Sequence, residues 1–250
     1  MKLFRKKKHK NTDVGLIPSM RDSIFNGNIK EVGVDIMEIG IDAVMEEGIL
    51  SEFPIAKTVI AMCKTGIAVK ERNLIKQTIA FVHSFNEGNI SDEARVEYRK
   101  KLENDPNWAE DELGRVLILL DANIDTVKSK MLGRLYCAYV KGAISWEKFC
   151  EYAEVNRRMF VYDYKLLNDL FKNALKISDR DKYKVGRLIG LGLVVAKESP
   201  ASVKTPIEKI QKHLINMHNE PDYIGNIIKM ADYELTSLGK GFVHVTHDKL

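Results

Sequence analysis

The stretch KYKVGRLIGLGLV at residues 182–194 predicts a change from helix to strand within a few residues. A helix is expected over Lys182–Leu191, and Gly192 then precedes an apolar run that is typical of a short strand. A second stretch, YELTSLGKGF at residues 233–242, begins with alternating residues and continues as a helix capped by Thr236. The sequence therefore predicts two short strands near the C-terminus, each adjoining a helix.

Turn and cap residues divide the chain before this region into helices. The expected helices are Ile29–Glu47, Ile55–Phe85 with a bend at Gly66, Ser91–Asn104, Ala109–Asn123, Ile124–Lys141, Trp146–Arg158 and Tyr162–Lys176, with a further helix-like segment at Thr205–His218. Part of Ile29–Glu47 also alternates like a strand, but its length favours a helix. The fold class expected is mainly α.

The charged residues are unevenly distributed. The net charge is +4, but residues 1–10 include six Lys and Arg residues and no acidic residue. The rest of the chain has 33 basic and 35 acidic residues and is therefore close to neutral. Residues 91–125 are acidic, so a basic surface over the whole protein, as in many nucleic-acid-binding proteins, is not expected. The basic arm is either a solvated tail or a contact for phosphate groups of lipid or nucleic acid.

Composition and motifs argue against several classes of protein. Three cysteines without a CxxC pair exclude a disulfide scaffold and favour the cytoplasm, with the inner face of the membrane as an alternative. The glycines at 186, 190 and 192 lie where a helix ends and a strand follows. A dinucleotide-binding motif has the reverse order, with the strand before the glycines and the helix after them. The carboxylates of Asp111, Glu112, Asp121 and Asp125 are expected on solvated helix faces. We therefore expect no catalytic residue, metal, cofactor or small-molecule substrate.

The two C-terminal stretches resemble a winged helix-turn-helix, in which a helix turns through Leu-Gly-Leu into a wing strand and the returning strand ends in Tyr-x-Leu-Thr-x-Leu-Gly. Unlike the usual short wing, residues 196–232 form a long insertion. The resemblance implies either a DNA reader, in which Lys182, Lys184 and Arg187 face the duplex, or a module that packs against other protein. The expected fold is a helical bundle followed by a winged-helix-like module with a short β-ribbon.

This layout divides the chain into three parts. Residues 1–28 are a basic, flexible arm, residues 29–142 a helical domain with amphipathic apolar helices, and residues 143–250 the winged-helix-like domain. The stretches FPIAKTV (53–59) and KTGI (64–67), together with the interrupted wing, resemble small bacterial proteins of the abortive-infection alpha type. That resemblance implies a role in phage defence and supplies no catalytic residues.

Two functions remain open from the sequence. The first is a non-enzymatic interaction or effector protein of phage defence, with a protein partner or a homo-oligomer. Its membrane version uses Lys6, Lys7 and Lys8 of the arm with Lys57 and Lys64 on an amphipathic helix; in the alternative, those helices form the core of a helical bundle. The second function is a DNA-binding transcriptional regulator.

Overall fold

The computed structural model describes most of the chain after the basic arm. The described residues are 15–26, 53–63, 66, 68–172, 182–197 and 233–246. Predictions for the arm, for Ile29–Glu47 and for Thr205–His218 fall outside them. The chain divides into two compact units, Met1–Ala153 and Glu154–Leu250, and the division lies later than the predicted boundary after residue 142.

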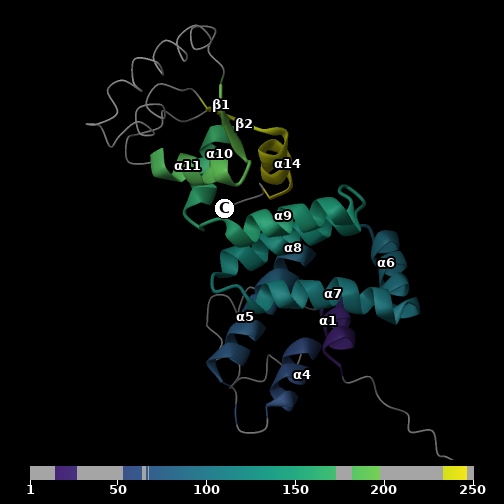
Figure 1. Cartoon of the computed structure of the whole chain (residues 1–250). Helices are drawn as coiled ribbons and strands as arrows, with labels where there is room; N and C mark the ends of the chain where they lie inside the picture. The colour runs from purple at the N-terminus through teal and green to yellow at the C-terminus, as the bar shows by residue number, and fades with distance from the viewer. Residues whose placement is uncertain are drawn as a thin grey trace, which may run out of the picture. The chain divides into compact units, whose positions relative to one another are not determined.

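The described chain is mainly α-helical with one two-stranded ribbon, as the sequence predicts (Figure 1). The helices of the first unit are α1 (Leu16–Phe25), α4 (Pro54–Met62), α5 (Val69–Glu87), α6 (Asp92–Asn104), α7 (Pro106–Asp121) and α8 (Thr126–Val140), followed by α9 (Trp146–Arg158), in which the division falls. The second unit contains α10 (Asp163–Phe171), α11 (Lys182–Gly190), β1 (Val194–Ala196), β2 (Tyr233–Leu235) and α14 (Ser237–Thr246).

Side-chain caps fix several helix ends where the sequence predicts them. The Ser91 hydroxyl accepts a hydrogen bond from the Ala94 N–H at 3.2 Å at the start of α6, and Ser145 accepts one from the Lys148 N–H at 3.2 Å at the start of α9. The long helix predicted over Ile55–Phe85 is wrong, because α4 ends at Met62 and α5 begins at Val69. Gly66 between them has φ +103°, a left-handed conformation that interrupts a helix.

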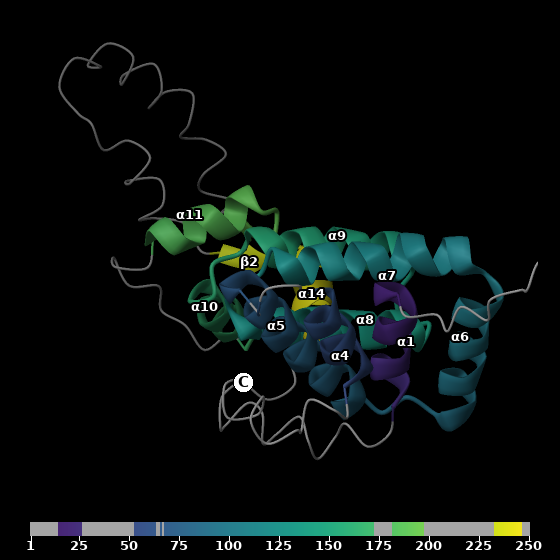
Figure 2. The same cartoon turned by 90° about the horizontal axis from the view of Figure 1, so that it is seen from below.

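The first unit is built around the contact between α5 and α8, with α7 also packed on α5 (Figures 1 and 2). Gly133 on α8 makes this approach close, since a Cβ atom there would overlap the carbonyl oxygen of Phe81 on α5. The fully buried side chains of Ile75, Ile79 and Phe85 lie along the buried side of α5. Glycine at the crossing lets the two backbones approach more closely than any other residue would.

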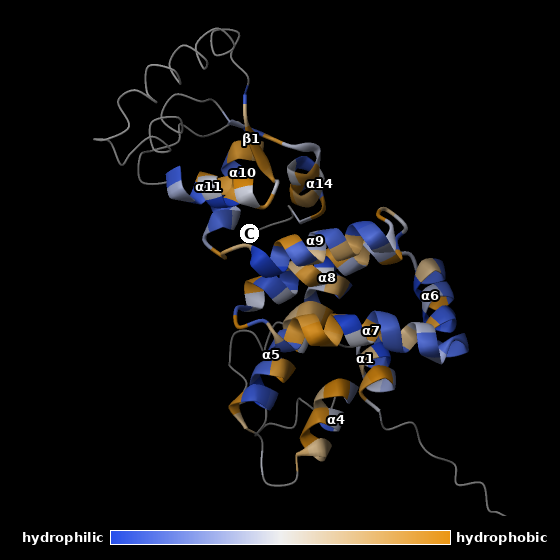
Figure 3. Ribbon diagram, viewed as in Figure 1, coloured by the Kyte–Doolittle hydropathy of each residue, from blue (hydrophilic) through white to orange (hydrophobic). Residues whose placement is uncertain are grey.

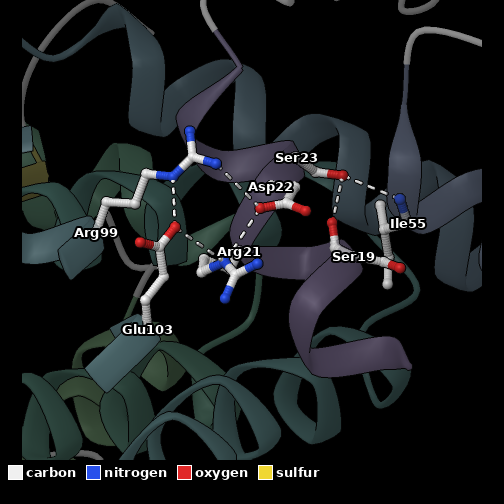
Figure 4. Close-up of polar contacts among 7 residues, drawn as sticks. All are labelled: Ser19, Arg21, Asp22, Ser23, Ile55, Arg99 and Glu103. Atoms are coloured by element: carbon white, nitrogen blue, oxygen red, sulfur yellow. Dashed lines mark hydrogen bonds and ion pairs between the residues drawn. The ribbon is translucent and has the colours of Figure 1, made fainter. Parts of the chain in front are cut away.

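Short polar contacts attach α1 to α4 and α6 (Figure 4). The Ser23 hydroxyl accepts from the Ile55 N–H at 3.0 Å, and the buried hydroxyls of Ser19 and Thr58 lie 2.6 Å apart. On the other side, Arg99 of α6 lies 3.5 Å from Asp22 of α1. Helix α4 is mostly orange in Figure 3, and its buried face includes Ile55, Ala56 and Val59.

The second unit gathers α10, α11 and α14 around the ribbon (Figure 1). Strands β1 and β2 pair antiparallel, with Val194 opposite Leu235. The Thr236 hydroxyl donates to the Gly192 carbonyl at 2.7 Å and accepts from the Gly239 N–H at 3.0 Å. This one side chain therefore joins the turn before β1 to the start of α14, as its predicted role as a cap requires.

Candidate functional site

Exposed aromatic rings lie near the Arg187–Asp163 ion pair in the second unit. The side chains are Phe160 and Tyr162, in the turn between α9 and α10, and Tyr183 on α11; they are 60%, 82% and 61% exposed. The guanidinium carbon of Arg187 lies 4.8 Å from the ring centres of both Phe160 and Tyr183. We name these four residues the aromatic platform. Large exposed aromatic groups that gather in one place mark binding surfaces.

Arg187 holds the platform together through Asp163, the first residue of α10. Its Nε and Nη2 atoms donate to the two carboxylate oxygens at 2.8 and 2.6 Å. Asp163 is fully buried, whereas the Arg187 side chain is 34% exposed. The hydrogen bonds that Arg187 donates to Asp163 raise the pKa of Arg187, so the guanidinium stays charged. Such a bidentate pair fixes the guanidinium plane, against which the two rings pack.

Basic residues outnumber acidic ones in the second unit. The described residues of the second unit include nine Lys and Arg against four Asp and Glu, and the whole unit has 16 against 12. Two of the four acids are already paired within the unit, Asp163 with Arg187 and Glu154 with Arg157 and Arg158. The second unit therefore carries a net positive charge.

The predicted site residues that the structure describes lie on α11 and on α4. Lys182 and Lys184 lie half-buried on α11 on either side of Tyr183, and Arg187 lies one turn further along the same helix. Lys57 is exposed on α4, in the first unit. Lys6, Lys7, Lys8 and Lys64 lie outside the described residues. The three predicted α11 residues thus share one helix. The structure adds Phe160, whose ring packs against Arg187, and its neighbour Tyr162, neither of which stands out in the sequence.

The most unusual polar cluster is buried in the first unit. Glu112 on α7 is 2% exposed and accepts hydrogen bonds from three tyrosine hydroxyls: Tyr136 at 2.7 Å, Tyr139 at 3.0 Å and Tyr98. Burial raises the pKa of Glu112 to about 7, against the smaller opposing effect of these hydrogen bonds. The predicted solvation of Glu112 is wrong.

The position of Glu112 in α7 explains its burial. It lies three residues after Ala109 and four before Val116, so it falls on the apolar stripe that also contains Leu113 and Leu120. This spacing is visible in the sequence and is the signal that identifies the residue as buried. Glu112 lines neither of the two surface grooves along α6, and its described hydrogen bonds link α7 to α6 and α8.

A groove of about 750 Å³ lies between the end of α5 and α6, with Phe25 at its edge. Its two arginines already have partners: Arg95 donates to the Asn86 side chain at 2.8 Å, and Arg99 pairs with Glu103 at 2.9 Å. Within the described ranges, no group of three His, Cys, Asp or Glu residues is placed to bind a metal. Likewise, none of the described helices has the length and apolar character needed to cross a membrane.

Comparison with known proteins adds no further assignment. No family model, no curated protein and no solved structure matches this chain.

Proposed function

We propose that this protein is a non-enzymatic binding protein whose second unit captures a macromolecular partner on the aromatic platform. The observation that carries the proposal is the Phe160–Arg187–Tyr183 arrangement, held by the buried carboxylate of Asp163. Tyrosine and arginine are enriched among the residues that dominate binding energy at interfaces. Rings whose positions are fixed before binding lose little conformational entropy when a partner arrives.

The resemblance to abortive-infection alpha proteins gives this binding activity a biological setting, and we propose that the chain acts as an effector in phage defence. The alternative of a duplex-reading regulator is less well supported. Guanine is read by a bidentate arginine, and the Nε–Nη2 edge of Arg187, with two of its five N–H donors, is already bound to Asp163. In this interpretation Arg187 is a positioning residue for the rings.

Phage challenge of bacterial cells tests the proposed function. Cells that produce the protein are compared with cells that produce Tyr162→Ser/Tyr183→Leu, which removes two exposed rings, and with Tyr162→Phe/Tyr183→Phe, which keeps them. We expect the wild type and the Phe variant to lower plaque formation, and the Ser/Leu variant at equal protein level to lose this protection. Equal protection by the wild type and both variants, or no protection by the wild type, would contradict the proposal.

A further inference from the structure

The chemistry of the aromatic platform points to one kind of partner, and the choice of that partner rests on the proposed function. We infer that the platform binds single-stranded nucleic acid, with unpaired bases stacking on Phe160, Tyr162 and Tyr183 and the phosphates meeting the surrounding lysines. Proteins that bind single strands combine aromatic rings for stacking with a positively charged surface along the backbone.

The rings are arranged so that bases can reach them. Arg187 covers one side of Phe160 and one side of Tyr183, and both residues remain about three-fifths exposed despite this contact. Tyr162, two residues after Phe160, is the most exposed of the three. Every base has a π-face, so such rings bind a strand with little regard to sequence.

The net charge of the second unit favours a polyanion over a neutral partner. Lys182 and Lys184 flank Tyr183 in the sequence of α11, and the described part of the second unit has more than twice as many basic as acidic residues. Gly186 and Gly190 lie one and two turns from Tyr183, and a Cβ atom at either would meet nothing within 4 Å. A sugar–phosphate backbone can therefore approach this face of α11 closely.

The same geometry favours a single strand over a duplex. Bases in a duplex are stacked on one another and offer only their edges to a protein. Arg187, the residue best suited to read such an edge, has two donors bound to Asp163. Exposed rings, in contrast, need bases that are free to leave the stack.

Fluorescence anisotropy with the full-length chain tests this inference. The probes are labelled single-stranded RNA, single-stranded DNA and duplex DNA of mixed sequence, each about twelve nucleotides long. We expect the single strands to bind at least about tenfold more tightly than the duplex at about 50 mM salt, with weaker binding at about 200 mM. Tighter binding of RNA than of DNA would identify the 2′-hydroxyl as a further contact.

Matched variants assign the binding to the platform. Tyr162→Ser and Tyr183→Leu should each lower affinity about tenfold, the loss expected for one stacked base, while Tyr162→Phe and Tyr183→Phe retain it. Ile118→Ser removes an exposed apolar side chain of the first unit and should have no effect. The basic arm is present in every variant, so its contribution does not change.

Three results would overturn the inference: no binding of single strands at about 50 mM salt, equal affinity for the duplex, or full affinity in the folded Ser and Leu variants. Recovery of a protein through the intact platform, after nuclease treatment and without oligonucleotide binding, would also overturn it. Recovery of a protein partner would contradict the nucleic-acid inference and would still agree with the proposed function. The proposed function is tested separately, by the phage challenge.

Discussion

At the scale of single residues, Glu112 couples the stability of the first unit to pH. Its pKa in the folded protein is about 7, above the ordinary value of 4.5, so folding favours the protonated carboxyl. The contribution of Glu112 to stability is then fully present below about pH 4.5 and is lost as pH rises through 7. The shift corresponds to about 3 kcal/mol between the two ends of that range.

Glu112→Gln removes the ionisation and keeps an oxygen that can accept from the tyrosines. Urea unfolding at about pH 5 and about pH 8 should show a loss of about 2–3 kcal/mol at the higher pH in the wild type, and less than about 1 kcal/mol in the variant. Asp111→Asn, at the exposed neighbouring position, is the control and should retain the wild-type dependence. The same pH dependence in wild type and Glu112→Gln would rule out Glu112 as its source.

Arg187 neutralises a buried carboxylate, so its removal should affect folding. Arg187→Met is expected to lower the free energy of unfolding by about 2–3 kcal/mol, because Asp163 is left buried without its partner. The exposed Lys165→Met, on α10, should change it by less than about 0.5 kcal/mol. The double variant Asp163→Asn/Arg187→Met should regain part of the unfolding free energy that Arg187→Met loses. If denaturant unfolding gives the double variant no such gain, the importance of the Arg187–Asp163 pair for stability is contradicted.

At the scale of elements, the crossing of α5 and α8 depends on one missing side chain. Gly133→Ala would push a methyl group into the backbone of α5 near Phe81. We expect a loss of about 3 kcal/mol or more in unfolding free energy, as for an overfilled core. Gly114→Ala on α7 is the matched control, because its nearest neighbours would be 3.9 Å away; there the better helix propensity of alanine should leave stability unchanged or raised by up to about 1 kcal/mol.

The ribbon and α14 share the Thr236 hydroxyl. Thr236→Ala removes both its hydrogen bond to the Gly192 carbonyl and the cap of α14, so a loss of about 1–2 kcal/mol is expected. Thr236→Ser keeps the hydroxyl and should lose much less. Thermal unfolding followed by circular dichroism compares the two, and equal melting temperatures for Ala and Ser would show that the hydroxyl has no such role.

Local signals in the sequence predict the elements well where they depend on near neighbours. The glycine at 192 and the apolar residues after it indicate β1, and the serines at 91 and 145 mark helix starts that the structure confirms. The break between α4 and α5 is missed because apolar residues continue across Gly66, whose left-handed φ depends on the surrounding fold. The burial of Glu112 is missed because its charge is weighed above its place on the apolar stripe of α7.

At the scale of the whole molecule, the candidate site illustrates what a sequence does not reveal. Arg187 is a predicted site residue, but its partners Asp163 and Phe160 come from a different part of the chain, and a pairing over 24 residues has no local signature. The two compact units also differ in charge: without the six cations of the arm, the first unit has 17 basic and 23 acidic residues, and the second has 16 and 12. Outside the basic arm, a polyanion is therefore expected to bind the second unit rather than the first.

Photo-cross-linking in living cells examines binding by the platform most directly. A photoreactive phenylalanine analogue replaces Tyr162 in one variant and the exposed Ile118 of the first unit in another. On irradiation, position 162 should yield a nuclease-sensitive cross-linked species, and position 118 should yield far less. Equal yields at the two positions, or no cross-link from position 162 in cells where the protein protects against phage, would contradict a binding surface at the platform.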